Sequence, residues 1–108
     1  MSKYGNRKTV VDGIVFDSAR EARRWQELTL LERCGEITGL QRQVPFELIP
    51  TQREGKKVVE RAVVYIADFV YTENGRRIVE DAKGVRTKEY IIKRKLLRYL
   101  CGVTVREV

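Results

Sequence analysis

The stretch YIADFVYTENGRRIVEDAKG, residues 65–84, contains the turn on which the fold depends. Asn74-Gly75 at its centre is the strongest short signal for a β-hairpin, because a type I′ turn needs positive φ at both central residues and these two tolerate it. When the antiparallel pairing is continued outward from this turn, Asp68 lies directly opposite Asp81. The sequence therefore predicts two carboxylates on one face of a hairpin.

The facing aspartates need an explanation, because like charges on facing strand residues are destabilising at a Cβ separation of about 4.5–5.5 Å. Period-two alternation places apolar residues on both faces of the first strand, which predicts a strand buried on both sides and a partly desolvated Asp68. We expect Val64, Ile66 and Val70 on the face of Asp68, and Tyr65, Ala67, Phe69 and Tyr71 on the other. Lys83 projects from the face of Asp81 and can reach diagonally toward Asp68.

Glu21 is a third acid with a claim on the same site, because it shares a helical stripe with Trp25 and Leu28 that we expect to face the sheet. Three acids and one lysine leave about two negative charges, which a hard divalent cation such as Mg²⁺ or Mn²⁺ would complement through oxygen ligands. Glu80 points away from this face and is expected to be a solvated or salt-bridged neighbour.

Each candidate also has a purely structural interpretation. Glu21 follows Ser18 at the spacing of a capping box, and its position alone favours that role. Asp68 and Asp81 can form a structural pair that shares a proton or is bridged by the lysine. The prediction of a functional site rests on the whole constellation.

Local signals predict one domain over residues 1–108, with a loosely held N-terminal arm over residues 1–8. Ser18 and Gly35 delimit a first helix, and Gly102 closes a second one. We expect a helix at Ser18–Cys34, strands at 42–50 and 56–72 separated by a turn, a strand at 76–83, a helix at 87–101 and a short strand within 103–108. The predicted class is α/β (α+β), with the order α, β, β, β, α, β.

Composition favours a nucleic-acid partner. The chain has 22 Lys and Arg against 15 Asp and Glu, a net charge of +7, which suits a polyanion. It has no histidine, so the commonest general base is absent and hydrolysis would rely on carboxylates, lysine and a metal. Without a signal peptide or a membrane span, it is expected in the cytoplasm, away from membranes.

Basic residues concentrate on the two helices. Those expected to contact phosphates are Arg20 and Arg24 beside Glu21, and Lys88, Lys93 and Lys95 on the second helix. The apolar stripe of that second helix, Ile92, Leu96, Tyr99 and Leu100, is expected to pack on the sheet and leave the opposite face cationic. Such contacts bind phosphate without reading bases, which predicts selection of DNA by its structure.

An Asp, a hairpin and an Asp-x-Lys, preceded by a helical Glu, resemble the PD-(D/E)xK nuclease superfamily, and most closely its small phage-encoded proteins related to Holliday junction resolvases. The resemblance runs from KYGNRKTVVDGIVFDSAREARRW through VPFEL and YIADFVY to VEDAKGVRTKEY. It implies a restriction-endonuclease-like core, in which a mixed central sheet is flanked by two helices. Ala67 stands where the motif's name has proline, a position that often departs from the motif.

Carried onto this chain, the resemblance implies that Asp68 and Asp81 bind a metal ion and that Glu21 is a further ligand or positions water. Lys83 would be the catalytic lysine, and the backbone carbonyl of Ala82 would complete the metal site. The implied activity is that of a Mg²⁺- or Mn²⁺-dependent endodeoxyribonuclease with one or two ions. Its partner would be DNA, including branched DNA, and cutting two strands symmetrically would require a homodimer.

Two other functions stay open. The chain can be a non-catalytic nucleic-acid-binding module that retains the nuclease fold, with Asp68, Asp81 and Lys83 as a buried ion cluster. A weaker third interpretation is an adaptor within a phage replication or packaging assembly, in which the net charge is incidental.

Overall fold

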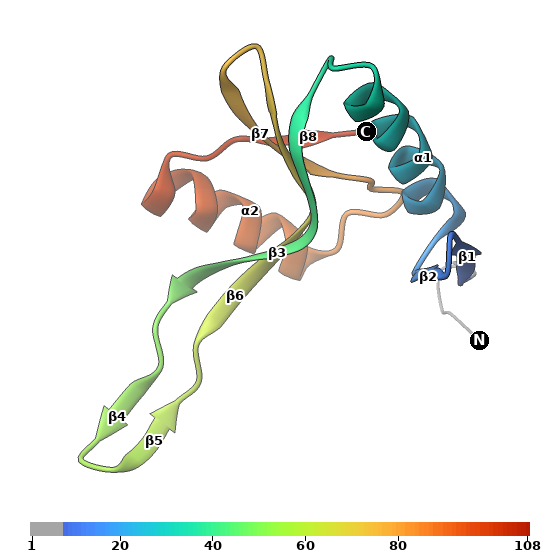
Figure 1. Ribbon diagram of the computed structural model, residues 1–108. Coiled ribbons are helices and arrows are strands. Elements are labelled where there is room, and N and C mark those ends of the chain that lie inside the picture. Colours follow the sequence, from blue (N-terminus) through green and yellow to red (C-terminus); the bar gives the residue numbers. More distant parts are fainter. Residues whose placement is uncertain (1–7) are drawn as a thin grey trace.

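The computed structural model describes residues 8–108, so that only Lys8 of the expected N-terminal arm lies among the described residues (Figure 1). The elements are β1 (Thr9–Val11), β2 (Ile14–Phe16), α1 (Ala19–Arg33), β3 (Thr38–Ile49), β4 (Gln52–Glu54), β5 (Lys57–Glu60), β6 (Val63–Glu73), β7 (Arg76–Asp81), α2 (Lys88–Cys101) and β8 (Val105–Glu107). The fold is α+β. No helix within residues 8–108 has the length and apolar character needed to cross a membrane.

The central sheet has the order β3-β6-β7-β8, with antiparallel pairs except for the parallel pair of β7 and β8. The two helices cover opposite faces of it, as the neighbouring residues of β7 show. Ile78 packs in a cluster with Leu28 of α1, whereas Val79 packs in a cluster with Leu97 of α2. A mixed sheet flanked by two helices is therefore confirmed.

The β6–β7 hairpin has the predicted turn and register. Asn74 and Gly75 have φ values of 51° and 75°, and the strands pair from Glu73 with Arg76 to Phe69 with Glu80. The same register places the next pair, the two aspartates of the candidate site, opposite each other. The Asn-Gly signal was sufficient because few residues other than glycine and asparagine tolerate positive φ at both positions.

The residues of β6 that face α2 change from odd-numbered to even-numbered positions at Asp68, so the predicted assignment of residues to the two faces of this strand is wrong beyond that point. Residues before it (Tyr65, Ala67) and after it (Val70) all belong to the cluster with α2, whereas Phe69 and Tyr71 belong to the cluster with α1. On β3, Gln43 lies between the partners of Ala67 and Phe69 and has φ 53°. The strand is therefore not buried evenly on both sides, and Ile66 is 53% exposed.

Both helices form where predicted, but α2 presents a different face to the sheet. Caps at Ser18 and Thr87 start the helices, and Gly102, with φ 68°, ends α2. The buried residues of α2 are Tyr90 and Leu97. The expected stripe is wrong for three of its four residues, since Ile92, Tyr99 and Leu100 are 58%, 87% and 50% exposed, whereas Leu96 packs against the core as expected. Two apolar stripes compete on this helix, and Tyr90 decides between them because its ring packs on Tyr65 and its hydroxyl donates to Glu107.

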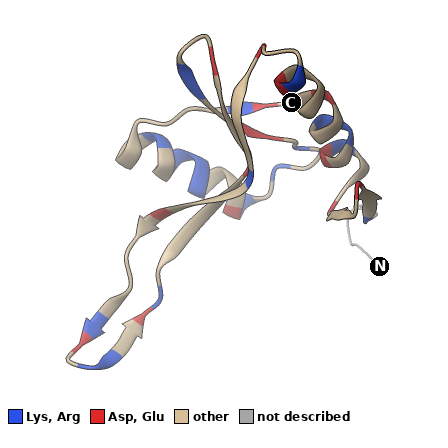
Figure 2. Cartoon of the chain, viewed as in Figure 1, with Lys and Arg blue, Asp and Glu red and all other residues tan. Residues whose placement is uncertain are grey.

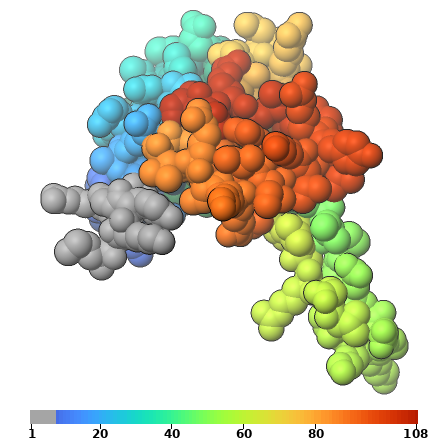
Figure 3. All heavy atoms as spheres, turned by 180° about the vertical axis from the view of Figure 1, so that it is seen from behind, coloured from blue at the N-terminus to red at the C-terminus, as the bar shows by residue number. Residues whose placement is uncertain are grey.

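Two hairpins were not predicted. β1 and β2 form a small hairpin before α1. β4 and β5 form the end of a long β-ribbon that continues β3 and β6 beyond the pair Ile49–Val63, and we call residues 50–62 the arm. The arm stands clear of the body (Figure 3). The expected turn at 51–55 is thus partly strand, and the expected strand 56–72 is two strands.

Candidate functional site

A pocket of about 270 Å³ lies where the start of α1, the middle of β6 and the segment after β7 meet. It is lined by Asp17, Ser18, Arg20, Glu21, Asp68, Ala82, Lys83, Gly84, Val85 and Thr87. Four of the five residues expected to bind the metal or act in catalysis, Glu21, Asp68, Ala82 and Lys83, therefore share one cavity. The fifth, Asp81, is fully buried behind it.

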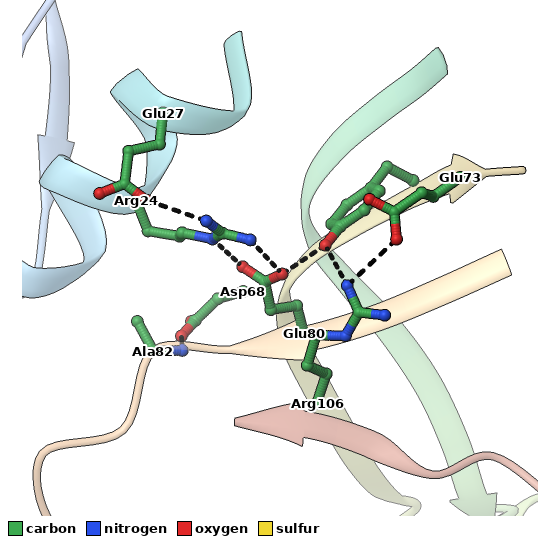
Figure 4. Close-up of polar contacts among 8 residues, drawn as sticks. Arg24, Glu27, Asp68, Glu73, Glu80, Ala82 and Arg106 are labelled. Atoms are coloured by element: carbon green, nitrogen blue, oxygen red, sulfur yellow. Dashed lines mark hydrogen bonds and ion pairs between the residues drawn. The ribbon is translucent and has the colours of Figure 1, made fainter. Parts of the chain in front are cut away.

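The two aspartates join β6 to β7 through their side chains. The Asp68 backbone N–H donates to Asp81 Oδ1 at 2.9 Å. The Ala82 N–H donates to Asp68 Oδ2 at 3.0 Å, a bond that Figure 4 shows. The second oxygen of Asp81, Oδ2, is buried and has no hydrogen-bond partner among the described residues. A buried acceptor without a donor is unfavourable, so this atom is a candidate ligand for a cation.

Glu21 combines a structural role with a place in the site. Its backbone N–H donates to Ser18 Oγ at 3.1 Å, which is the capping interaction expected from position alone. Its carboxylate, however, accepts a hydrogen bond from Gln43 Nε2 at 3.4 Å and lies 3.7 Å from Arg42 Nη2. The backbone caps the helix while the side chain faces the pocket.

Gln43 is a site residue that the sequence did not predict. Besides its contact with Glu21, its amide donates to Asp68 Oδ1 at 3.3 Å, so that it bridges two of the acids. A glutamine in a strand carries no chemical signature. Only its left-handed backbone, which aims the side chain at Asp68, gives it this position.

Asp17 is a second residue missed by sequence reasoning. It lines the pocket directly before Ser18, and its charge raises the pKa of Glu21 and of Asp68. Its place next to a helix cap is a common one for aspartate, so neither its residue type nor its position singled it out. It adds a fourth acid to the edge of the site.

The acids of the site carry more negative charge than the protein neutralises. Burial and the nearby carboxylates of Asp68 and Asp17 raise the pKa of Glu21 to about 7, although the positive charges of Arg42 and Lys83 act against them. Burial also raises the pKa of Asp81 to about 6, against the opposing charge of Lys83 and the hydrogen bond from Asp68. The pKa of Asp68 is raised by burial, although the Ala82 N–H and Lys83 act against it.

Lys83 lines the pocket but does not pair with a carboxylate within residues 8–108. Its Nζ lies 4.5 Å from the centre of the Tyr90 ring, a cation–π distance. Its backbone N–H donates to the Val108 carbonyl, and the Val108 N–H donates to the Asp81 carbonyl. The chain after β8 thus fixes the backbone on both sides of Ala82.

Glu80, next to Asp81, is neutralised instead. It is fully buried, accepts from Arg24 Nε at 2.6 Å and Nη2 at 3.0 Å, and also accepts from the Tyr71 hydroxyl (Figure 4). Arg106 Nη1 in turn donates to the Tyr71 oxygen at 3.3 Å. The expectation of a salt-bridged neighbour is confirmed, whereas a solvated Glu80 is wrong because α1 covers this face.

The basic residues are divided between the pocket and the rest of α2. Arg20 lines the pocket, and Lys88 follows Thr87, which also lines it. Lys93 pairs with Glu89 at 3.0 Å, while Lys95 lies farther along α2, where Lys and Arg are frequent (Figure 2). Arg24, also expected to bind phosphate, is committed to Glu80 and Glu27. Of the five residues expected to bind phosphate, Arg20 is thus the one that lines the pocket, and Lys88 follows a lining residue.

The donor set suits a hard divalent cation in its chemistry. Glu21, Asp68 and Asp81 offer carboxylate oxygens, Ala82 offers a carbonyl, and one oxygen of Asp81 has no other partner. Within residues 8–108, however, no three Asp, Glu, Cys or His side chains are already grouped as a metal site. The amide of Gln43 holds one oxygen each of Glu21 and Asp68, so ion binding would require this side chain to move.

Comparisons with known proteins add a family assignment. No curated protein and no solved structure matches the sequence significantly. A family model described as "Protein of unknown function (DUF1064)" matches residues 1–105, which is nearly the whole chain. The chain therefore belongs to the DUF1064 family.

Proposed function

We propose that this protein is a metal-dependent DNA endonuclease that hydrolyses phosphodiester bonds, with a preference for branched DNA such as junctions or flaps. The main support is the convergence of Glu21, Asp68 and Lys83 from separate elements on one pocket, with Asp81 directly behind. The proposal includes a restriction-endonuclease-like core. It also places the protein in phage recombination or replication, in the cytoplasm of a bacterial host.

The ion would be Mg²⁺ or Mn²⁺, held by Glu21, Asp68, Asp81 and the carbonyl of Ala82. A divalent ion in such a site lowers the pKa of bound water and neutralises phosphate oxygens. The raised pKa values of Glu21 and Asp81 support this donor set. A bound cation would offset both the repulsion between carboxylates and the cost of burying their charges, which are what raise these pKa values.

Lys83 would act on the attacking water or on the phosphate. Its ammonium lies on the pocket side of Tyr90 and donates to no carboxylate within residues 8–108, so its hydrogens are available to a substrate oxygen. The cation–π contact restricts the side chain without using its hydrogen-bond donors. Arg20 and Lys88 would bind the neighbouring phosphates as point charges or forks, without reading bases.

A second candidate function is favoured by the hydrogen bonds of the acids. Gln43, the Asp68 N–H and the Ala82 N–H already donate to four carboxylate oxygens of Glu21, Asp68 and Asp81. Buried carboxylates whose oxygens already accept hydrogen bonds from the protein can be purely structural. The protein would then be a non-catalytic nucleic-acid-binding module that retains the nuclease fold.

Cleavage assays separate the two functions. Labelled four-way junction, flap, single-stranded and duplex DNA would be incubated with the parent protein in Mg²⁺, Mn²⁺ or EDTA. The variants are Asp68→Asn and Lys83→Ala, with Glu54→Gln on the exposed arm as the matched control. We expect cutting by the parent and the control only with metal, and a loss of about 10²-fold or more in either site variant.

Two results would count against the endonuclease. Metal-independent cutting that survives Asp68→Asn would reject this site. Salt-sensitive DNA binding without cutting under either ion would favour the binding module, and circular dichroism of each variant would show that the fold is retained.

A further inference from the structure

The backbone of Lys83 is fixed, but this alone does not place its side chain in the pocket. The Lys83 N–H donates to the Val108 carbonyl at 3.3 Å, and the Val108 N–H donates to the Asp81 carbonyl at 2.9 Å. The segment at 82–87 that contains the lysine belongs to no helix or strand. A lysine side chain has several rotatable bonds, so a fixed backbone does not by itself determine where the ammonium lies.

The ring of Tyr90 is the contact that restricts this side chain. Lys83 Nζ lies 4.5 Å from the ring centre, and no carboxylate within residues 8–108 forms an ion pair with it. The face of a ring attracts the positive charge and leaves all three N–H donors free, whereas a carboxylate would occupy them. The contact therefore suits a lysine that must offer its hydrogens to another group in the pocket.

Tyr90 is held in turn by three contacts. Its N–H donates to Thr87 Oγ1 at 3.1 Å, its ring packs on Tyr65 with the centroids 6.3 Å apart, and its hydroxyl donates to Glu107 Oε2 at 2.7 Å. These partners come from the cap of α2, from β6 and from β8. Tyr90 is 7% exposed, so its ring has little freedom to turn and can serve as a fixed surface for the ammonium.

Glu107 gives the Tyr90 hydroxyl a fixed acceptor. Arg86 donates to this carboxylate through Nε at 3.0 Å and Nη2 at 2.8 Å, and Arg94 Nη1 donates to it at 3.2 Å. The hydrogen bonds from Arg86 and Tyr90 lower the pKa of Glu107 to about 2, so this side chain is ionised at neutral pH. The end of the chain thus supports the segment after β7 twice, through the backbone of Val108 and through Glu107.

We propose that Tyr90 is the positioning residue of Lys83, with its ring holding the ammonium in the pocket and Glu107 holding the ring. Neither Tyr90 nor Glu107 lines the pocket, so both act through the lysine. The consequence for catalysis rests on the proposed endonuclease activity, whereas the place of the ammonium does not. The competing interpretation is that Tyr90 is only a core residue, since it also packs in the cluster with Leu97.

The cleavage rate separates positioning from packing. Tyr90→Leu removes the ring, and Tyr90→Phe removes only its hydroxyl. At saturating protein with Mn²⁺, we expect the rate to fall about 10²-fold in Tyr90→Leu, because a misplacement of about 1 Å can cost this much. Tyr90→Phe keeps the ring and should lose about threefold. The dissociation constant for junction DNA in EDTA should stay within about threefold of the parent in both variants, because Lys83 supplies one phosphate contact among several.

A matched control and a double variant complete this test. Phe46 packs against the same cluster and also carries a cation over its ring, with Arg77 at 5.1 Å from the ring centre, but it does not line the pocket. Phe46→Leu should therefore reduce stability in urea much as Tyr90→Leu does, yet leave the cleavage rate unchanged. In a Lys83→Ala protein, Tyr90→Leu should have no further effect on the rate, because the side chain that Tyr90 positions is already absent.

Nuclear magnetic resonance tests the contact without any cleavage. Protons that lie over an aromatic ring resonate upfield, so the ε-methylene signal of Lys83, assigned by Lys83→Arg, should lie upfield of the other lysine signals. It should move to the ordinary lysine position in Tyr90→Leu and remain upfield in Tyr90→Phe and Phe46→Leu. A parent that cuts no DNA but keeps the upfield signal would reject the endonuclease and still support this placement of Lys83.

Two results would overturn the proposal. One is a Lys83 ε-methylene signal at the ordinary lysine position in the folded parent, since the ring would then not hold the ammonium. The other is the same loss of rate from Tyr90→Leu in the parent and in the Lys83→Ala protein, which would show that Tyr90 acts through packing alone.

Discussion

Glu80 and Asp81 are neighbours on β7, both fully buried, yet the protein treats their charges in opposite ways. Glu80 points toward α1, where Arg24 and Tyr71 satisfy both of its oxygens. Asp81 is buried behind the pocket, where one oxygen receives the Asp68 N–H and the other has no partner among the described residues. A neutralised buried charge holds elements together, whereas one that is left incompletely neutralised provides a place for a ligand.

The largest expected change in stability comes from removing Glu80, the neutralised residue of the two. Glu80→Ala should lower the free energy of unfolding by about 3–5 kcal/mol, because it leaves the Arg24 guanidinium and the Tyr71 hydroxyl without their partner. Urea unfolding followed by circular dichroism measures this. The control is Glu27→Gln, which breaks only the exposed ion pair of Arg24 and should cost less than about 1 kcal/mol. Equal losses in the two variants would show that burial of Glu80 does not matter.

Metal binding at Asp68 and Asp81 should stabilise the folded protein, independently of Glu80. Mg²⁺ or Mn²⁺ at about a hundred times its dissociation constant should raise the free energy of unfolding by about 2.7 kcal/mol, which a thermal melt detects. Asp68→Asn should remove this increase, and Glu80→Gln should retain it because Glu80 faces away from the pocket. An increase that survives Asp68→Asn would place the ion elsewhere.

Asp81→Asn should stabilise the protein in the absence of metal, by about 1–2 kcal/mol. Burial raises the pKa of Asp81 to about 6, so the ionised side chain is unfavourable at neutral pH. An asparagine keeps an acceptor for the Asp68 N–H and carries no charge. Chemical unfolding at pH 7 measures the change, and a clear loss of stability would mean that the charge of Asp81 is already balanced.

The pH dependence of stability should show the same imbalance with a smaller effect. The pKa of Glu21 is raised from 4.5 to about 7, so the folded protein binds a proton there more tightly than the unfolded chain. The stability that this provides is complete below the unfolded value and is lost as the pH rises through about 7. Between pH 5 and 8 the parent should lose about 1 kcal/mol more than Glu21→Gln. Parallel unfolding curves of the two proteins over this range would contradict the raised pKa.

The two sides of β7 also differ in how far the sequence predicts them. Asn74-Gly75 fixed the register, and the register alone brought Asp68 opposite Asp81. The sequence left Glu80 either solvated or salt-bridged, because its state depends on Arg24, which is 56 residues away along the chain. Spacing within one hairpin is local information, whereas neutralisation of a buried charge is decided by how separate elements pack.

The same distinction explains the other errors. The helices were placed correctly because caps and glycine stops are local, but the buried face of α2 depends on Tyr65 and Glu107, which other strands supply. Gln43 reaches the site because of its left-handed backbone, and Asp17 because it precedes the helix cap. Neither position is marked by a particular residue type. The arm was missed since its polar, glycine-containing tip has the composition of a turn.

The arm has a consequence for how this chain folds. Its tip pairs Glu54 with Lys57, its base pairs Ile49 with Val63, and the same ribbon ends at Thr38 with Thr72. Once the tip has formed, each further pair closes a loop only slightly larger than the one before, so the longest pairing in the sheet is reached without a large loss of chain entropy. Cutting the arm back to a short turn should therefore leave the candidate site in place, and any change in refolding rate would report how far the sheet assembles by zipping from this tip.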